Sequence, residues 1–408
     1  MKQSTIIRSL LALMLLLPMV SSAQTENFWT RKSDFLGLKR ERAVAFTADG
    51  FAFVGTGLDT AEIVHNDFWK YDPIADSWTQ VADLPGSVRR NAIAFSVADK
   101  GYVGTGMNTA TSQELGATKL SDMYEYDPTT NQWTAKAPFP GAFGGGIYFA
   151  TGFAIDSKGY ICGGKIGSNW YSSELWEYKP STDQWIQLPS FPGGVRYQLS
   201  SFTIGFKGYV GMGTDQDLYR KDFWAFDAST NQWTAVADLP GSERASSMTF
   251  TIGNRGYVCM GTNGGMLDDL WEYNPDNDQW SSKAPYGGSR RKGGVGFSLN
   301  GKGYLGTGKG YSGKKQSIHE YTPTSFVGLD ELTAPMGVYP NPASEFINVL
   351  DKTYQIESVQ ICGLNGKVIQ ESHELQSIDI RGLETGMYLL FGRNSKNEII
   401  ASQKINVQ

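Results

Sequence analysis

The chain has 408 residues, and its 36 lysines and arginines against 41 aspartates and glutamates give a formal net charge of −5. A mildly acidic chain without a long basic run is a poor nucleic-acid binder, so we expect no nucleic-acid partner. Three histidines and three cysteines leave little material for a metal site, so no metal and no cofactor are expected. The 48 glycines and the 13% aromatic content are typical of short strands and tight turns.

The first 23 residues have the pattern of a secretory signal peptide. Lys2 and Arg8 precede an apolar run over residues 10–20, and small residues follow at 21–23, where a signal peptidase would cut after Ala23. The apolar run is too short to span a bilayer comfortably, and no later run reaches that length, so no transmembrane helix is expected in the mature chain. We therefore expect an exported protein in an oxidising compartment.

The cysteines do not suggest a disulfide. Cys162 and Cys259 occupy the same position in two separated repeats, described below, and Cys362 lies outside the repeats. Two sulfur atoms in separated repeats are too far apart to bond. We expect three small buried apolar residues; a reactive thiol is the alternative.

One signature recurs six times along the chain. It combines a glycine-rich strand with an acidic-aromatic strand, and examples are KGYVGTG, ending at Gly106, followed by DMYEYDP at 122–128. The glycine-rich strands end at Gly57, Gly106, Gly164, Gly213, Gly261 and Gly308. The acidic-aromatic strands lie at 67–73, 122–128, 174–180, 222–228, 269–275 and 317–323.

A tryptophan follows five of these six signatures. The residues are Trp78, Trp133, Trp185, Trp233 and Trp280, at intervals of 55, 52, 48 and 47 residues. A period near ~50 residues is that of a four-stranded propeller blade.

The sixth repeat has no tryptophan after Tyr321, and the start of the chain has a spare one. Trp29 lies 49 residues before Trp78, in the segment Phe28-Trp29-Thr30. We infer that this segment supplies the outer strand of the last blade. Such closure joins the two ends of the ring and removes the open sheet edges of a linear array.

These features resemble the kelch repeat: the glycine-rich end of the second strand, the Tyr-x-Pro end of the third, and the tryptophan a few residues later. The resemblance covers Phe28 to about Ser325 and implies a six-bladed kelch β-propeller over 24–325. The glycine pair is usually GTG or GMG here, and only Gly163-Gly164 is a true doublet. That departure leaves the subfamily open.

The composition changes after a linker at 326–335, and a second domain is predicted at 336–408. About seven short alternating strands in ~75 residues favour a small immunoglobulin-like β-sandwich, so the whole chain is expected to be all-β. Asn365-Gly366 is a strong hairpin signal between two of these strands.

This second domain closely resembles the type A C-terminal sorting domain of the type IX secretion system. The residues that carry the resemblance lie in the YPNPA opening, the GLNGK turn, the GMY strand and the KINV ending: Tyr339, Pro340, Asn341, Pro342, Gly366, Gly386, Tyr388 and Lys404. The resemblance implies a Bacteroidota source and, as partners, the type IX secretion machinery and its sortase. It also implies a secreted protein, either extracellular or attached to the outer-membrane surface; an ordinary immunoglobulin-like accessory domain is the alternative.

Strand parity indicates which face of the propeller is functional. In an up-and-down blade, the loops between the second and third strands lie on the face where the first strand begins. Here these loops are long, as at 58–66, 107–121, 165–173 and 309–316, whereas the turns on the other face are short. Loops on a rigid scaffold are the usual carriers of binding residues, so this long-loop face is the candidate.

An arginine recurs six positions before the phenylalanine of the first strand. The set is Arg40, Arg89, Arg196, Arg244 and Arg291, and the third repeat has Ile147 there. An acid opens the third strand in five repeats, at Asp67, Asp122, Glu174, Asp222 and Asp269, and the sixth repeat has Ser317. The arginines could capture carboxylates of acidic sugars or peptides.

Alternatively, each arginine forms an ion pair with an acid and has only a structural role in holding the ring together. The acid could belong to the same blade or to an adjacent blade, and either arrangement gives four pairs. Tyr197, Asn169, Trp170 and Tyr171 flank the same face and could stack on a sugar, or be ordinary surface residues.

The main functional hypothesis is a surface-delivered propeller that binds a glycan or protein ligand without catalysis. Kelch propellers include copper oxidases, but a copper site of that kind needs two histidines and two tyrosines, and this propeller has only His65 and His319. His319 stands where other repeats have tryptophan, so a packing role is expected. The alternative function is an epimerase or lyase of an acidic sugar, which needs an arginine and an acid/base pair. A purely structural surface component is the third class.

Overall fold

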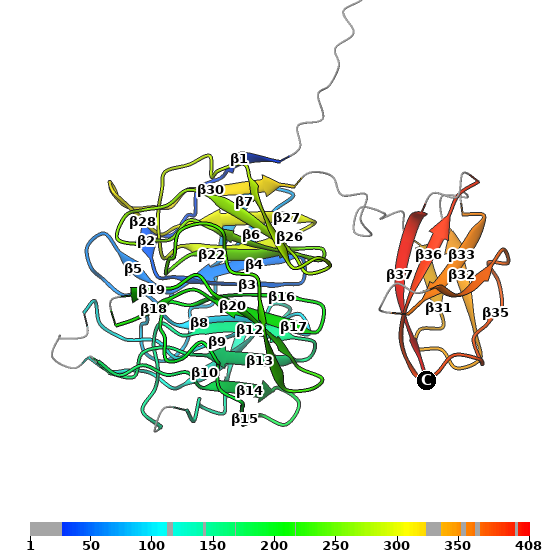
Figure 1. Ribbon diagram of the computed structural model, residues 1–408, viewed down its shortest axis with the longest axis horizontal. Helices are drawn as coiled ribbons and strands as arrows, with labels where there is room; N and C mark the ends of the chain where they lie inside the picture. The colour runs from blue at the N-terminus through cyan, green and yellow to red at the C-terminus, as the bar shows by residue number, and fades with distance from the viewer. Residues whose placement is uncertain are drawn as a thin grey trace, which may run out of the picture.

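The computed structural model is all-β, with no α-helix among the residues that it describes (Figure 1). The predicted signal peptide (1–23) and linker (326–335) lie outside these residues. The structure describes residues 27–111, 117–141, 144–167, 169–216, 218–323, 336–351, 356–363, 368–395 and 399–408.

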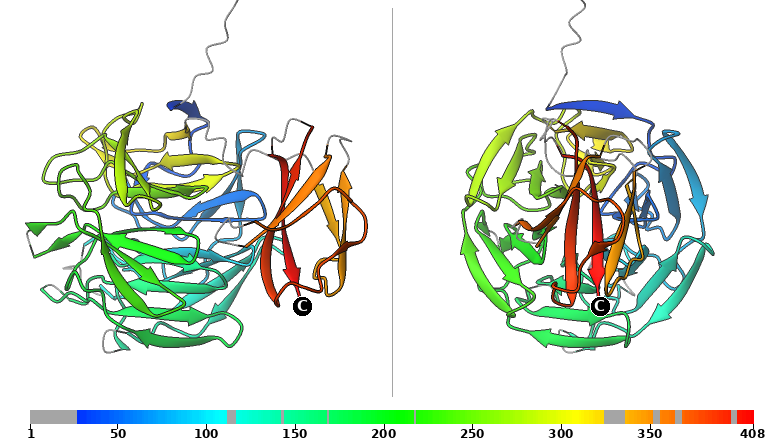
Figure 2. Two further views of the ribbon diagram at one scale, coloured as in Figure 1. Left: turned by 45° about the vertical axis from the view of Figure 1, so that its right-hand side comes forward. Right: turned by 90° about the vertical axis from the view of Figure 1, so that its right-hand side faces the viewer.

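Six four-stranded antiparallel sheets are arranged in a circle (Figure 2, right). Their inner edges enclose a central channel. The innermost strands line the channel: β3 (Val44–Ala48), β8 (Ile93–Val97), β12 (Thr151–Ile155), β16 (Ser200–Ile204), β22 (Met248–Ile252) and β26 (Val295–Leu299). The second strands are β4 (Phe51–Gly55), β9 (Lys100–Gly104), β13 (Lys158–Cys162), β17 (Lys207–Gly211), β23 (Arg255–Cys259) and β27 (Lys302–Gly306). We number the sheets as blades 1 to 6 in this order.

The two outer layers carry most of the tryptophans. The third strands are β6 (Phe68–Asp72), β10 (Met123–Asp127), β14 (Leu175–Lys179), β20 (Phe223–Asp227), β24 (Leu270–Asn274) and β30 (Ile318–Thr322). The outer strands are β7 (Ser77–Val81), β11 (Gln132–Lys136), β15 (Gln184–Leu188), β21 (Gln232–Val236), β25 (Gln279–Lys283) and β1 (Phe28–Lys32). Three short strand pairs lie outside the blades: β2 (Arg40–Glu41) with β5 (Leu58–Asp59), β18 (Thr214–Asp215) with β19 (Leu218–Tyr219), and β28 (Lys309–Gly310) with β29 (Gly313–Lys314).

Neighbouring blades pack through a phenylalanine laid over a glycine. A Cβ atom on Gly101 of blade 2 would lie 2.1 Å from the ring of Phe46 in blade 1, so only glycine fits there. The same contact recurs between Phe95 and Gly159 at the next border. Each such phenylalanine also stacks on an aromatic ring of its own blade; the rings of Phe95 and Tyr102 are 5.3 Å apart and 15° from parallel. The glycine recurs at five of the six borders and Ala52 takes its place between blades 6 and 1, so a small residue sets the distance between blades.

The start of the chain completes blade 6. β1 pairs antiparallel with β30, and Trp29 lies opposite Tyr321 in this register (Figure 1). The indole Nε1 of Trp29 donates to the carbonyl of Ala284 in blade 5 over 3.1 Å. In blade 2, Trp133 makes the same bond to Ala82 of blade 1 over 2.9 Å. The first strand thus reproduces the contacts of an outer strand inside the repeat, and the ring is closed.

The C-terminal part forms two sheets around a core of its own. Seven strands are present in the described residues: β31 (Met336–Tyr339), β32 (Phe346–Asp351), β33 (Ser358–Cys362), β34 (Val368–Ser372), β35 (Ile378–Asp379), β36 (Gly386–Arg393) and β37 (Ile399–Val407). One sheet has the order β31-β32-β35 and the other β34-β33-β36-β37. The predicted turn at Asn365-Gly366 lies outside the described residues.

Candidate functional site

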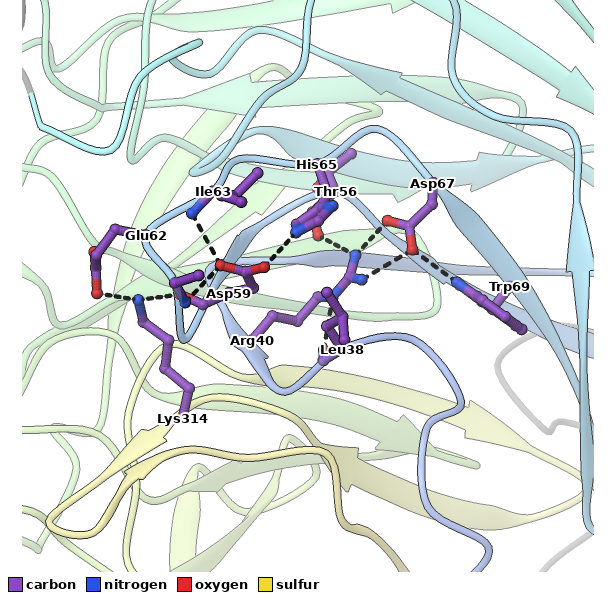
Figure 3. A network of polar contacts seen from close by, with 11 residues as sticks. Leu38, Arg40, Thr56, Asp59, Glu62, Ile63, His65, Asp67, Trp69 and Lys314 are labelled. Carbon is purple, nitrogen blue, oxygen red and sulfur yellow. Dashed lines mark hydrogen bonds and ion pairs between the residues drawn. The ribbon is translucent and has the colours of Figure 1, made fainter.

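Four of the five recurring arginines form two-pronged ion pairs with the acid of their own blade. In blade 1, Nη1 and Nη2 of Arg40 donate to the two oxygens of Asp67 over 2.5 and 2.9 Å, and Nη1 also donates to the Thr56 carbonyl (Figure 3). The other pairs are Arg89–Asp122, Arg196–Asp222 and Arg244–Asp269. Of the two registers that the sequence leaves open, the structure has the one within a blade.

The burial of these arginines favours a structural role. The side chains of Arg40 and Arg244 are 0% exposed, while their aspartates are partly exposed. Burial alone would favour the neutral acid, but the bonds and charge of Arg244 lower the pKa of Asp269, and Arg40 acts in the same way on Asp67. A ligand carboxylate would have to displace an aspartate already held in two-pronged geometry. These contacts favour the structural alternative for the four paired arginines, and their predicted role in direct ligand binding stays a prediction.

Two blades lack the full pair. Blade 3 has Ile147 in place of the arginine, and its Glu174 accepts a bond from the indole of Trp176 over 2.9 Å. Blade 6 has Arg291 but carries Ser317 in place of the acid.

A closed ring of six backbone hydrogen bonds surrounds one end of the channel. One residue of each blade donates its N–H to the carbonyl of its counterpart in the preceding blade, over 2.7–3.2 Å. All six have a positive φ, between 54° and 61°, which is uncommon for residues other than glycine. We call these residues the mouth ring: Arg42, Asn91, Phe149, Gln198, Ser246 and Gly293.

The side chains of the mouth ring differ from blade to blade. The guanidinium of Arg42 donates to Asn91 Oδ1 over 3.1 Å and lies over the ring of Phe149, 4.6 Å from its centroid. The amide nitrogen Nδ2 of Asn91 is buried and has no hydrogen-bond partner among the described residues. Asn91 also lines a cavity of about 120 Å³ at this end of the channel, so an unsatisfied donor lies at the mouth.

Cations gather on the blade 6 and blade 1 side of the mouth. Lys292 is half-buried beside the ring, and burial together with the charges of Arg42 and Lys309 lowers the pKa of its amine. Glu41 is buried next to them, with its oxygens 3.4 Å from Arg42 and 3.9 Å from Lys309. Because like charges meet here, an anionic group at the mouth would be stabilised.

Aromatic side chains gather on the opposite side, in blades 3 and 4. The rings of Tyr171 and Tyr197 stack 4.9 Å apart, 12° from parallel, and Phe149 lies 5.8 Å from Tyr197. Lys165 sits over both tyrosines, and burial lowers the pKa of its amine. We call Phe149, Trp170, Tyr171 and Tyr197 the aromatic rim, in which Trp170 is 66% exposed. The rim extends from the mouth ring outward, and it includes two predicted binding residues, Trp170 and Tyr197.

The channel below the mouth is lined by the inner strands, which contribute small residues such as Ala94, Gly152 and Ser201. Its volume is about 430 Å³. Hydroxyl groups bond across blade borders, as from Thr203 to the Ala154 carbonyl over 2.8 Å and from Thr249 to the Ser201 carbonyl over 2.6 Å. These hydroxyl groups link the inner strands of neighbouring blades and are therefore already hydrogen-bonded. The mouth, which has the unpaired donor of Asn91, is the better candidate for a ligand site.

The mouth ring could not be predicted from side-chain patterns, because its residues share no side-chain chemistry. The signal that could have found it is positional, since every member lies four residues before the phenylalanine of the first strand. The six positions share a backbone conformation and not a residue type.

The described sorting residues lie in β31, in the segment that follows it, in β36 and in β37. Tyr339 ends β31, and the side chain of Asn341 accepts a bond from the backbone of Asn406 in β37 over 2.8 Å. Gly386 opens β36, and the Tyr388 hydroxyl donates to the Glu384 carbonyl over 2.8 Å. Lys404 lies in β37, Pro340 and Pro342 flank Asn341, and Gly366 is outside the described residues. The YPNPA segment therefore docks on the last strand of the chain.

The histidines and cysteines take structural positions. His319 is buried and its Nδ1 shares a hydrogen bond of 2.6 Å with the Tyr286 hydroxyl. Cys162, Cys259 and Cys362 are all buried and unbonded to one another, and burial raises the pKa of each thiol.

The described residues contain neither a metal-binding cluster nor a membrane-spanning helix. No group of three or more histidines, cysteines, aspartates or glutamates there could hold a metal ion. The same part of the chain contains no helix with the length and apolar character needed to cross a membrane.

Comparison with known proteins supports both parts of the chain. A family model described as the KLHDC2/KLHL20/DRC7 Kelch-repeats domain matches residues 144–304, and one described as a secretion system C-terminal sorting domain matches residues 337–408. A solved structure titled "Structure of YjhT" is similar with a TM-score of 0.57 and 18% identity, over 72% of this chain and 96% of that one, which supports the fold alone. No curated protein matches the chain.

The sorting domain implies handling by type IX secretion machinery, and it indicates secretion with attachment at the cell surface or outer membrane. The chain is thus a kelch-repeat β-propeller with a C-terminal secretion-system sorting domain.

Proposed function

We propose that the propeller is a binding module, delivered to the cell surface, that holds a glycan at the channel mouth and on the aromatic rim without catalysing a reaction. The observation that carries this proposal is the unsatisfied amide donor of Asn91, which lines the mouth cavity between the cations and the aromatic rim. A buried donor without an acceptor costs free energy that a bound oxygen atom would recover.

The chemistry of the surface suits a sugar. A pyranose has an apolar face of C–H groups and an edge of hydroxyl groups. The exposed indole of Trp170 and the stacked ring of Tyr197 offer flat apolar area, and Asn91, Gln198 and Lys292 offer hydrogen bonds next to it. A few polar groups beside aromatic area are typical of specific small-ligand sites.

The test is a glycan array probed with the purified propeller. Wild type is compared with Trp170→Ala and Tyr197→Ala, and Phe206→Ala serves as the matched control, because Phe206 is an exposed aromatic residue in the turn between β16 and β17, on the other face. Each rim variant should lose about 5- to 30-fold in affinity, as expected for truncating a ~1–2 kcal/mol contact, while the control binds normally.

Other results would assign a protein ligand to the site or reject the site. If no glycan binds and a pull-down with surface proteins captures a partner whose binding depends on the same two residues, the ligand is a protein. If neither assay depends on the rim, the proposed site is wrong.

One observation keeps an enzyme as the second candidate. The amine of Lys292 has a lowered pKa because of partial burial and of the neighbouring cations Arg42 and Lys309, and an amine with a lowered pKa can act as a proton acceptor. The candidate reaction is epimerisation or elimination on an acidic sugar. Time-resolved NMR of D-glucuronate and of a sialic acid with wild type and Lys292→Met would detect it; turnover that Lys292→Met abolishes would promote the enzyme over the binding module.

A further inference from the structure

Blade 6 departs from the repeat at two linked positions. In the other blades with the recurring arginine, an acid faces the guanidinium, as Asp269 faces Arg244 over 2.5 and 2.6 Å. Blade 6 keeps the arginine, Arg291, but has Ser317 where the acid would be. It also has His319 where four other blades have a tryptophan whose indole donates to the acid that opens the third strand, such as Trp271 to Asp269. Both substitutions put a smaller side chain in the same place.

Arg291 is consequently a buried cation without a counter-charge. It is 1% exposed, and its donors reach only neutral oxygens: the carbonyls of Thr307, Ser289 and Ser317 and the hydroxyls of the two serines. Within the described part of the chain, no carboxylate oxygen lies within 4.0 Å of it, unlike the other four arginines of the set. Burial lowers the pKa of its guanidinium, in keeping with a charge that lacks compensation.

A pocket lies beside this guanidinium. Its volume is about 670 Å³, and its lining shares no residue with the cavity at the channel mouth. Five cationic side chains line it against one carboxylate, Asp34. Asp34 already pairs with Arg31 over 2.6 Å, and the imidazole of His319 is turned to Tyr286. The exposed amine of Lys39 and that of Lys315, which bonds Ser312, remain without a carboxylate partner among the described residues.

We propose that this pocket binds a small organic carboxylate, whose carboxyl group takes the place of the aspartate that blade 6 lacks and forms the two-pronged pair with Arg291. The four sister blades display the geometry of that pair within the same chain. Ser289 and Ser317 add hydroxyl groups at the carboxyl end, and Lys39 and Lys315 add positive charge at the entrance. The site is independent of the glycan proposed at the mouth.

The experiment measures thermal unfolding and isothermal titration of the full chain with acetate, D-glucuronate and inorganic phosphate, at ionic strength matched with chloride. Wild type should show a saturable rise in Tm with the two carboxylates. Ser317→Asp places a carboxylate of the protein itself opposite Arg291. Because this carboxylate would pair with the guanidinium, the variant should have a higher Tm without ligand and at least tenfold lower affinity for added carboxylates. Lys39→Gln, an exposed position, should weaken binding several-fold while the Tm without ligand stays the same.

Ser242→Asp is the control, because it adds the same charge at an exposed site in blade 5, where Arg244 is already paired. It should bind carboxylates like wild type. Equal responses of wild type and Ser317→Asp would overturn the proposal, as would an absence of any saturable carboxylate effect. Binding of phosphate alone would overturn the assignment to carboxylates.

Discussion

The Tyr321 hydroxyl donates to the side-chain oxygen of Asn27 over 2.8 Å, although 294 residues separate them. In blade 2 the equivalent bond joins Tyr126 to Asn131 over five residues of a tight turn. The backbone N–H of Ala284 also donates to Asn27, as that of Ala82 does to Asn131. Asn27, from the start of the chain, thus makes the two hydrogen bonds that Asn131 makes from a local turn in blade 2. These bonds help to hold the first strand in blade 6 and so close the ring.

The closing strand should carry a large share of the stability of the propeller. Trp29 packs against Tyr286 and Tyr321, each with a centroid distance of 5.1 Å. We expect Trp29→Ala to lower the free energy of unfolding by about 3–5 kcal/mol, as for other large aromatic residues truncated to alanine in a core. Urea denaturation measures this. Trp170→Ala, a change at an exposed tryptophan, should stay within about 0.5 kcal/mol of wild type; a similar small effect for Trp29→Ala would mean that the strand is dispensable.

The arginine–aspartate pairs should stabilise the fold at neutral pH. Asp269→Asn leaves Arg244 buried without its counter-charge, at a cost of about 3 kcal/mol, the lower end for a broken buried pair because the aspartate is 32% exposed. The folded-state pKa of Asp269 lies below its unfolded value, so this contribution is present above the unfolded pKa and is lost as the pH falls through the folded one. The difference between wild type and Asp269→Asn in urea should therefore shrink between pH 5 and pH 2; a difference that persists unchanged would argue against the ion pair.

His319 should make the propeller sensitive to mild acid. Burial, together with the charges of Arg291 and Arg31, lowers its pKa to about 4. The unfolded chain therefore binds a proton at a higher pH than the folded chain, and the stability present above about pH 6.5 is lost as the pH falls toward 4. Denaturation of wild type and His319→Gln at pH 7 and pH 4.5 tests this. Wild type should lose about 2 kcal/mol more than the variant, and equal losses would place the titrating group elsewhere.

The sorting domain should direct export and contribute little to the propeller. Deletion of residues 336–408 removes strands whose core lies entirely within that domain. We expect the truncated protein to fold and to accumulate in the periplasm, measured by fractionation and by protease accessibility on intact cells. Surface delivery of the truncated protein at the normal level would contradict the assignment.

Much of the fold could be predicted because similar packing contacts are needed wherever two blades meet. A small residue under a phenylalanine, a stacked aromatic ring and an outer tryptophan recur from blade to blade, so they reveal both the period and the missing strand. The pairing register could not be predicted, since Arg244 has an acid within its own blade and another in a neighbouring blade, and only the backbone path selects Asp269.

The candidate site was only partly predictable for a different reason. The long-loop face and the residues Trp170 and Tyr197 follow from strand parity. The mouth ring, by contrast, depends on a positive φ that residues as different as Arg42 and Gly293 share. This backbone conformation could not be predicted from the side chains, because the six residues have no side-chain property in common.

Hydrogen exchange tests the proposed binding site most directly. Amide exchange of the propeller is measured with and without the glycan that binds best on the array. We predict slower exchange at 148–149, 165–167, 169–171 and 197–198, around the mouth ring and the aromatic rim, and no change in the turns at 205–207 and 228–231 of the other face. Protection confined to those turns, or spread without preference over both faces, would contradict the assignment of the mouth as the binding site.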